Sequence, residues 1–456
     1  MKRALPLAAL LVACEPPAEY TCSARVSDTV NTVLLVDVTP PAGSTSDSIG
    51  RVVFGEDGAL DHETPEQPLT DGTTFRLLGL APLTQVSWHV FVGDEVVCEG
   101  VDSNKNLPSD LAEFDVTTLD ADRVSDTNYV LFALGGSHTG LVMADRQGQI
   151  VWYHLQSGVP AQWVQPYWRD TEAIFNAFDP SHLHDVASIT RVDAEGDELD
   201  VRRIVEGHHT FTPLEPGVYA YLRRDIRPWY DPLMDVNQAV AGDAIVEQAA
   251  DGTTERVVFD VWDWLEVRVT PEFYRRFYPD AKDWTHANSI HWREDDDTLL
   301  MAMSNLGTLV QIDRASGQPL RWFGNDGDNP YGYSEGSRHM QLPHDPTWTG
   351  DDTFMVFMTD DSIGRSGAIE YRIDEANHVL DEVWSYGFGD GEPIHRAFFL
   401  GQARRQTNGN TIVKWASTGR MVEVTPDKKI VWDLHLSLGG YFQEADFIDD
   451  IYEVTP

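Results

Sequence analysis

The sequence has few basic residues. Its 33 Lys and Arg stand against 74 Asp and Glu, and the formal net charge is −41. Phosphate groups are bound mainly through Lys and Arg, so this balance excludes nucleic acid and anionic lipid as ligands of a broad protein surface. The acidic residues are spread through the expected turns, which is typical of a solvated surface rather than of an acidic tail.

Several patterns that would identify other functions are also missing. Beyond residue 14 no segment is long and apolar enough to cross a membrane. The sequence has no G-x-S-x-G, which argues against a Ser-His-Asp hydrolase. It has no pair of histidines with the spacing of H-E-x-x-H, so a zinc protease is not expected either.

Cysteine is rare, and the first of the 3 lies at the end of an N-terminal export signal. A basic start at residues 1–3 and a short apolar segment at residues 4–12 form the pattern of a signal peptide. The next residues resemble a bacterial lipobox, so we predict a lipoprotein signal peptide over residues 1–14 with lipidation of Cys14. Glu15 follows where Asp would retain the protein in an inner membrane, which predicts an outer-membrane anchor facing the periplasm or the cell surface in a Gram-negative source. A plain signal peptide with a chance cysteine is the alternative.

The other two cysteines, Cys22 and Cys98, bound a small N-terminal region. An exported protein with two remaining cysteines is expected to join them in a disulfide, and two free buried cysteines are the alternative. Between and around them, Pro, Gly and Asp turns separate short apolar or alternating runs, at residues 33–38, 50–54, 73–78, 86–92 and 95–97. We therefore predict a β-sandwich over residues 20–118.

A different rhythm begins at Tyr129, in which a turn repeatedly leads to a strand that carries a Trp. These tryptophans are Trp152, Trp262, Trp322, Trp384 and Trp432. Irregular periods of about 40–60 residues, each with several strands, are typical of propeller blades that carry insertions. We count about six such units and predict an all-β chain with a six-bladed β-propeller over residues 125–456. The alternative is that each Trp packs between two sheets without marking a repeat.

Histidines stand just before the first expected strand of three of these units. They are His208 and His209, His286 within the polar segment 283–288, and His344. The first strand of a blade lies near the propeller axis, so these positions are expected to converge at one mouth of the central funnel. Loop residues held by a rigid sheet are where chemistry usually occurs. The alternative is a set of unrelated capping or core histidines.

Several segments of the sequence resemble the bacterial arylsulfate sulfotransferase family, among them His208-His209 and residues 423–426. Residues 283–290 match D-W-x-H-x-N-S-I, residues 342–345 resemble the family's Q-H-D segment, residues 408–411 carry N-G-N-T, and residues 317–324 match its G-x-ϕ-x-W-x-ϕ-G blade ending, where ϕ is apolar. The resemblance runs from about Tyr129 onward. It implies a six-bladed propeller that moves a sulfuryl group between phenols without 3′-phosphoadenosine phosphosulfate.

The resemblance also implies roles for individual residues. His344 is expected to be the nucleophile that forms a sulfo-histidine, and His286 with His209 or His208 is expected to hold or protonate the bridging oxygen. Asn288 is expected to donate a hydrogen bond to the sulfonate. The implied partners are a small phenolic sulfate donor and a phenol acceptor, and no cofactor is expected.

One position departs from the family pattern. Where the family carries an Arg after the D-W-x-H segment, this sequence has Ser304. A neutral Ser cannot replace a guanidinium that clamps a sulfonate, and losing such a donor typically reduces the rate by about 10²–10³. Arg338, Arg396 and Arg405 lie near other blade starts and are candidate replacements. Ser304 and Arg405 are therefore included among the expected substrate-binding residues.

Two other functional classes stay open. The chain could be a catalytically impaired arylsulfotransferase-like propeller that acts as a cell-surface ligand- or partner-binding lipoprotein; Ser304 favours this alternative, and the retained histidines oppose it. The second is a metal site, because His182, His184 and Asp185 offer imidazole and carboxylate ligands. Their spacing matches no established ligand motif, so no metal is expected.

Overall fold

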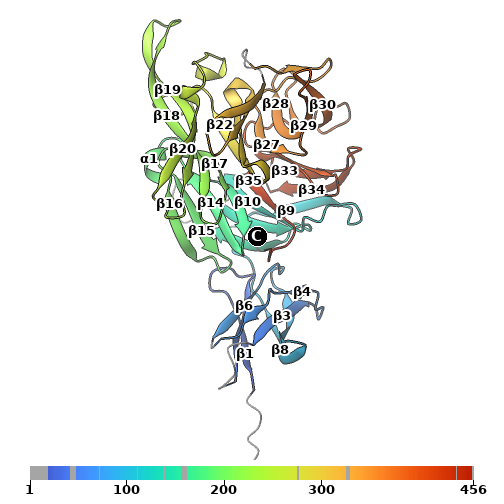
Figure 1. Ribbon diagram of the computed structural model, residues 1–456. Coiled ribbons are helices and arrows are strands. Elements are labelled where there is room, and N and C mark those ends of the chain that lie inside the picture. The colour runs from blue at the N-terminus through green and yellow to red at the C-terminus, as the bar shows by residue number, and fades with distance from the viewer. Residues whose placement is uncertain are drawn as a thin grey trace, which may run out of the picture.

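Antiparallel strands form nearly all of the structure, a computed structural model that describes residues 19–41, 48–70, 72–109, 111–136, 139–155, 162–274, 277–324, 329–437 and 439–453. The predicted signal peptide at residues 1–14, with Cys14, lies outside the described residues. Within these ranges no helix combines the length and the apolar character needed to cross a membrane. A smaller β domain lies at one end of the molecule and a larger one at the other (Figure 1).

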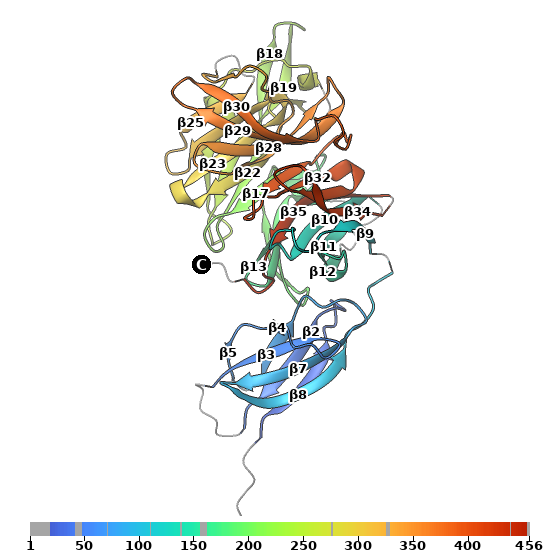
Figure 2. The same cartoon turned by 90° about the vertical axis from the view of Figure 1, so that its right-hand side faces the viewer.

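The smaller domain consists of two sheets that share one core (Figure 2). The first sheet contains, in spatial order, β1 (Thr21–Val26), β2 (Leu34–Thr39) and β6 (Thr73–Leu77). The second contains β4 (His62–Glu63), β3 (Ile49–Glu56), β7 (Gln85–Val92) and β8 (Glu95–Ser103), with β5 (Gln67–Pro68) also paired to β3. Side chains from both sheets, including Phe54, Phe75 and Trp88, build the shared core. Two sheets that bury their inner faces against each other form the arrangement of a sandwich.

A disulfide links Cys22 in β1 to Cys98 in β8, with the Cα atoms 6.2 Å apart. The predicted pairing is therefore confirmed, and the alternative of two free cysteines is excluded. Because β1 and β8 belong to different sheets, the bond ties the two halves of the small domain together.

The predicted end of the small domain at residue 118 needs a correction. β9 (Phe114–Leu119) pairs with β34 (Ile430–Leu436), so it is an outer strand of the larger domain. The strands of the small domain end at Ser103. The alternating pattern of β9 fits a half-buried strand in either domain, which is why the sequence alone misplaced it.

In the described part of the larger domain, the strands form six sheets of four or five strands each. In chain order of the sheets, the strands are β10 (Tyr129–Gly136), β11 (Gly140–Asp145), β12 (Ile150–Leu155) and β35 (Gly440–Ile448); β13 (Gln162–Arg169), β14 (Glu172–Phe178), β15 (Ser188–Asp193) and β16 (Glu198–Arg203); β17 (Gly207–Pro213), β18 (Tyr219–Asp231), β19 (Val236–Gln248), β20 (Glu255–Asp260) and β21 (Lys282–Asp283); β22 (Ala287–Arg293), β23 (Thr298–Met303), β24 (Thr308–Asp313) and β25 (Pro319–Gly324); β26 (Gly332–Tyr333), β27 (His344–Trp348), β28 (Thr353–Asp360), β29 (Arg365–Asp374) and β30 (Val379–Tyr386); and β31 (Gln402–Arg405), β32 (Thr411–Trp415), β33 (Arg420–Val424), β34 and β9. The short helices between them are α1 (Leu183–Val186), η1 (Val261–Asp263), η2 (Glu272–Tyr274), η3 (Glu294–Asp296), η4 (Ser304–Leu306) and η5 (Ala416–Thr418).

The six sheets follow one another around a ring (Figures 1 and 2). Each contributes an edge strand to the inside: β13 lies against β35, β17 against β13, β22 against β17, β27 against β22, and β31 against β27. The last strand, β35, then pairs with β10 and completes the first sheet. A ring of sheets closed in this way is a β-propeller, which confirms the predicted fold, and the sheets are as many as the predicted blades.

Tryptophans fasten neighbouring sheets of the ring to one another. The buried indole of Trp152 in the first sheet donates to the carbonyl of Ala194 beside the second sheet, at 2.9 Å. Trp432 in the sixth sheet donates in the same way to Arg146 beside the first, also at 2.9 Å. A buried indole N–H needs an acceptor, and here the acceptor is a backbone carbonyl of the adjoining blade. Trp152 and Trp432 therefore both fill the space between sheets and mark the repeat.

Candidate functional site

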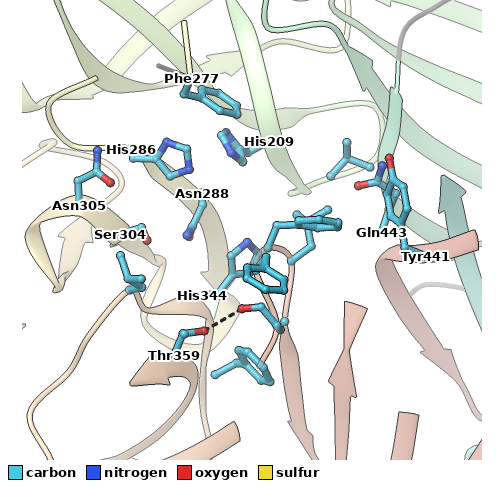
Figure 3. Close-up of a pocket in the computed structure, with 18 of the residues that line it drawn as sticks. His209, Phe277, His286, Asn288, Ser304, Asn305, His344, Thr359, Tyr441 and Gln443 are labelled. Carbon is cyan, nitrogen blue, oxygen red and sulfur yellow. Dashed lines mark hydrogen bonds between the residues drawn. The ribbon is translucent and has the colours of Figure 1, made fainter. Parts of the chain in front are cut away.

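A cavity of about 680 Å³ opens between the inner strands of the propeller, and we call it the histidine cavity (Figure 3). His209, His286 and His344 all line it, although they come from the separate strands or strand entrances of β17, β22 and β27. Asn288 and Ser304 line it as well. The structure therefore brings together five of the side chains that the sequence singled out.

The same distortion of the backbone occurs where each histidine enters the cavity. β17, β22 and β27 each shift their pairing register near their first residues, as β-bulges do. The left-handed region is reached at His209, His286 and Asp345, with φ of 52°, 49° and 50°. Non-glycine residues adopt this region rarely, and such strain concentrates at functional sites. The bulge turns the side chains of these residues away from the alternating pattern of the strand.

His209 reaches the cavity, and His208 stands behind it. The Nδ1 atoms of the two rings are 2.8 Å apart, and Nε2 of His208 lies 3.1 Å from the Asp243 carboxylate. Because Nε2 of His208 faces a carboxylate, that nitrogen carries a proton. In a neutral ring, Nδ1 of His208 then accepts a hydrogen bond from Nδ1–H of His209. This arrangement leaves Nε2 of His209 with a free lone pair. Burial, and repulsion from the other imidazoles, holds the pKa of His209 well below 6.5.

Asp243 is the fixed end of this chain of contacts. Its carboxylate accepts hydrogen bonds from the Thr285 hydroxyl and, at 2.6 Å, from the backbone N–H of Ala287. Burial acts to raise the pKa of Asp243, but these donors and His208 outweigh it, so the pKa lies below its ordinary value. Asp243 is therefore a buried anion that holds the tautomer of His208.

His286 has a carboxylate of its own. Its Nδ1 lies 2.6 Å from Asp283 Oδ2, so Nδ1 carries a proton toward the carboxylate while the ring lines the cavity. The ring is packed edge-on against Phe277 and His209, with centroids 4.7 and 4.8 Å away. The carboxylate of Asp283 favours positive charge on this ring, which suits His286 to donate a proton.

His344 is held neutral. Burial, together with the positive charge of Lys414, lowers its pKa to about 3, although the charge of Asp345 acts in the opposite direction. A neutral imidazole has the free lone pair that a nucleophile needs. One ring nitrogen of His344 faces the space shared with His209 and Asn288 (Figure 3).

Asn288 presents a hydrogen-bond donor of fixed direction. Its carbonyl oxygen accepts from the Ser289 hydroxyl at 3.0 Å, and its amide nitrogen donates to the carbonyl of Pro343 at 2.9 Å. These two bonds identify which side of the amide is nitrogen. The second N–H of the amide remains for a ligand in the cavity, because an amide nitrogen has two hydrogens.

The position where the family carries an Arg lies at the cavity wall. Ser304 is buried, and its backbone N–H donates to the carbonyl of His286 at 3.1 Å. Among the described lining residues, Arg396 is the one Lys or Arg. Its guanidinium bonds to Asp361 at 2.8 Å and lies over the ring of Phe398.

The expectation for Arg405 needs a correction. Its guanidinium forms an ion pair with Glu370 and donates to Thr411 Oγ1 at 2.7 Å, and it is not among the residues that line the cavity. Arg338 is paired with Glu382 instead. Of the three arginines considered as replacements for the missing clamp, only Arg396 reaches the cavity wall.

Aromatic side chains form much of the remaining wall. They are Phe178, Phe277, Phe357, Phe398, Phe399 and Tyr441. Phe398 and Phe399 are 72% and 44% exposed, which is unusual for residues of this size and polarity. Flat apolar walls of this kind suit an aromatic ligand.

The metal alternative receives no support from the side chains that the structure describes. His182 and His184 belong to the exposed α1 region, and Nδ1 of His182 is bonded to Asp179 at 2.9 Å. In the described ranges no group of three or more His, Cys, Asp or Glu is placed to hold a metal ion.

Sequence reasoning missed several residues of the site. Asp243, Asp283 and the aromatic wall were given no role, although Asp283 is part of the D-W-x-H segment itself. The carboxylate three residues before His286 was a usable signal, because a short turn can bring such a pair into contact. Asp243 carried no comparable signal, since it lies in β19, 42 residues before Thr285 in the sequence.

Comparisons with known proteins agree with the resemblance seen in the sequence. A family model described as Arylsulfotransferase (ASST) matches residues 118–435. No curated protein is significantly similar to the chain. A search of solved structures finds the β-propeller domain of the Trilobed protease from Pyrococcus furiosus, at 10% identity and a TM-score of 0.27, over 63% of this chain and 97% of that one. A likeness this distant adds nothing to the fold described above.

The neutral state of His344 predicts how stability depends on pH. Its pKa is about 3 in the folded chain against an ordinary 6.5. Between these values the unfolded chain binds a proton that the folded chain does not. Stability should therefore fall as the pH drops below 6.5, by about 1.4 kcal/mol per pH unit from this one group.

His344→Asn removes this titrating group and tests the prediction. Urea denaturation at several pH values gives the free energy of unfolding as a function of pH. The slope of that function should correspond to about one bound proton fewer in the variant than in the unmodified chain. An identical slope in both proteins would show that His344 is not held neutral.

Proposed function

Because the chain belongs to the arylsulfotransferase family, we propose that it transfers a sulfuryl group from an aryl sulfate to a phenol through a covalent intermediate on His344. The observation that carries this proposal is the convergence of His209, His286 and His344 on one cavity with aromatic walls. Imidazoles provide a nucleophile and proton donors, and the aromatic walls fit the donor and the acceptor. The group is carried on the protein itself, so the proposal includes no cofactor.

The first half-reaction moves the sulfuryl group onto the protein. The lone pair of a ring nitrogen of His344 attacks sulfur, and an N–S bond forms while the S–O bond to the aryl group breaks. The aryl oxygen leaves with the electron pair of that bond and takes the Nε2 proton of His286, which enters the step as an imidazolium and keeps its Nδ1 proton on the Asp283 side, so a neutral phenol departs. The low pKa of His344 supports the role of nucleophile, because the ring is unprotonated at neutral pH.

The second half-reaction reverses these roles. An acceptor phenol occupies the position of the first, and His286, now without its proton, removes the proton of the phenol. The oxygen attacks sulfur, the N–S bond breaks, and His344 recovers its lone pair. Dividing the transfer into two displacements is the general advantage of covalent catalysis. His209, with its lone pair fixed by His208 and Asp243, is placed to accept a hydrogen bond from the phenol.

The sulfonate oxygens need donors that stay in place while charge develops on them. Asn288 offers one N–H whose direction is set by Ser289 and Pro343. Arg396 offers a guanidinium at the cavity wall, whereas the position of the family's own Arg is occupied by Ser304. We assign the sulfonate to the region between Asn288 and Arg396.

The second candidate is a propeller that binds a ligand or partner without catalysis. The observation that favours it is Ser304, because a buried neutral side chain stands where the family has a cation. The same cavity would then bind an aryl sulfate or a phenol at its aromatic wall. The activity assay below separates the two candidates.

The activity should appear without a nucleotide donor. Incubation with 4-nitrophenyl sulfate and excess phenol is expected to release nitrophenolate, measured by its absorbance, and to produce phenyl sulfate. His344→Asn should abolish release, because the nucleophile is lost. If His344→Asn keeps full activity, the covalent mechanism is wrong. If every variant and the unmodified chain are inactive with the fold intact, the binding function is favoured.

The leaving group distinguishes the nucleophile from the acid. Nitrophenolate departs easily without a proton, whereas unsubstituted phenolate does not. His286→Asn should therefore reduce the rate by about 10²–10⁴ with phenyl sulfate and by much less with 4-nitrophenyl sulfate. Asn is chosen because it tolerates the left-handed backbone at this position better than Ala. Equal losses with both donors would contradict the role of His286 as acid.

Arginine exchange tests where the sulfonate binds. Arg396→Ala should raise KM and lower kcat, with a loss in kcat of about 10²–10³ if the guanidinium contacts the transition state. Adding Ser304→Arg to Arg396→Ala returns the cation to the family position and should recover part of the activity. Arg405→Ala is the matched control, because Arg405 lies outside the cavity. If Arg396→Ala is as active as Arg405→Ala, the assignment of Arg396 is wrong.

The proposed location is the cell envelope, with the chain held by a lipid on Cys14 as its one contact with the membrane. The Cys22–Cys98 disulfide supports export, because disulfides persist in oxidising compartments. Cys14→Ser is expected to move the protein from the membrane fraction to the soluble fraction, and Cys22→Ser should leave it in the membrane fraction. Unchanged membrane association of Cys14→Ser would contradict lipidation at this residue.

A further inference from the structure

A fully buried ion pair lies directly beneath the nucleophile. Lys414 in β32 and Glu444 in β35 are both 0% exposed, and Lys414 Nζ is 2.7 Å from Glu444 Oε2. The ammonium also donates to the backbone carbonyl of Gln443. Removing two charges from water is unfavourable, and an apolar pair of the same size is often as stable. A pair of this kind therefore points to a function.

The second oxygen of Glu444 faces His344. Glu444 Oε1 and His344 Nδ1 are 3.4 Å apart, both are buried, and within the described residues neither has another hydrogen-bond partner. Buried polar atoms without partners are rare in folded proteins. Two such atoms that face each other at this distance form a hydrogen bond after a small movement of either side chain.

The neighbouring charges are already engaged elsewhere. Asp345 is bonded to His291 at 2.6 Å and paired with Arg404 at 2.8 Å. Lys414 is engaged by Glu444 and Gln443. Glu444 is thus the carboxylate that remains available to the ring of His344.

We propose that Glu444 is the positioning residue of His344: its carboxylate accepts the Nδ1 proton, so that Nε2 presents its lone pair to the cavity, and Lys414 keeps that carboxylate ionised. Only the catalytic effect of this role rests on the proposed function. The tautomer itself is a property of the resting protein. Burial raises the pKa of Glu444, and the charge and hydrogen bond of Lys414 oppose that rise.

The charges balance through the reaction. In the resting state His344 is neutral, and Lys414 and Glu444 cancel. When Nε2 bonds to sulfur, the ring keeps its Nδ1 proton and becomes positively charged, while the aryl oxygen departs with the electron pair. The carboxylate of Glu444 then faces this positive ring, so the charge that appears on the ring has an anion beside it. When the N–S bond breaks, the ring returns to its neutral state.

The tautomer of His344 can be measured without any substrate. In the protein labelled with ¹⁵N-histidine, ring nitrogen shifts and couplings distinguish Nδ1–H from Nε2–H, and His344→Asn identifies the signal. We expect Nδ1–H in the unmodified protein. The backbone of Gly401 is the competing partner of the ring. An Nε2–H tautomer in the unmodified protein would overturn the proposal.

Variants of the pair test its catalytic consequence. The amide of Glu444→Gln can donate to Nδ1 and so select the wrong tautomer, and kcat should fall by about 10³–10⁴ with KM within about twofold. Lys414→Met leaves Glu444 without its cation, so kcat should recover as the pH rises and the carboxylate ionises. Glu444→Asp keeps a carboxylate and should retain more activity than Glu444→Gln.

Glu423→Gln is the matched control, because Glu423 is also 0% exposed and its partner Arg146 lies 2.6 Å away. It should lower stability with kcat unchanged. If Glu444→Gln does not fold, Lys414→Met/Glu444→Gln removes both charges together and should still lose the Nδ1–H tautomer. An unchanged kcat in a folded Glu444→Gln would overturn the proposal.

Failure of this inference differs from failure of the proposed function. An inactive unmodified protein with His344 as Nδ1–H, changed in Glu444→Gln, supports the positioning role and rejects the sulfuryl transfer. An active protein with His344 as Nε2–H supports the sulfuryl transfer and rejects the positioning role.

Discussion

The pairing of β35 with β10 is the contact on which the site depends. The register runs from Gly136 opposite Gly440 to Tyr129 opposite Ile448, and it joins the end of the propeller to its beginning. The same strand places Gln443 in the cavity wall and Glu444 beneath His344. The cavity therefore exists only after β17, β22, β27 and β35 have all reached their places. Opening this one pairing would remove the support of His344 together with part of the wall, so stability of the ring and geometry of the site are linked.

Burial explains why each cavity histidine has a carboxylate behind it. A buried imidazole resists protonation, which keeps it nucleophilic but leaves it poorly suited to bear positive charge. A carboxylate on the far side of the ring reduces that difficulty: Asp283 for His286, Asp243 through His208 for His209, and Glu444 for His344. The carboxylates differ in how their own charge is offset. Asp243 accepts hydrogen bonds from neutral donors, whereas Glu444 has a full cation in Lys414. The positive charge of Lys414 also helps to keep the ring of His344 neutral, as a nucleophile must be.

The propeller and its histidines could be predicted from the sequence because both follow from short sequence patterns, namely the Trp repeat and the D-W-x-H segment. The partners of those histidines could not, since Asp243 and Glu444 reach them only through strand register and ring closure. Arg404 and Arg405, two adjacent residues, illustrate why strand register is needed to place a side chain. The two are neighbours in β31, so their side chains point to opposite faces: Arg404 pairs with Asp345 near the site, and Arg405 pairs with Glu370 away from it. Without the register, a sequence cannot tell which face is which. The same limit misplaced β9, whose alternation suits either domain.

Ser304 changes how an anion has to be recognised in this cavity. A net charge of −41 repels a sulfate ester at long range, so donors inside the cavity have to supply the attraction. Arg396 is suited to this because its present partner holds it only weakly: the side chains of Arg396 and Asp361 are 40% and 38% exposed, and exposed ion pairs contribute about 0–1 kcal/mol. Exchanging Asp361 for a sulfonate therefore requires little free energy. In the proposed reaction, the opposite exchange is equally easy once the sulfuryl group has moved to His344. In the proposed reaction, a weakly held cation of this kind can thus exchange Asp361 for the sulfonate when the donor binds.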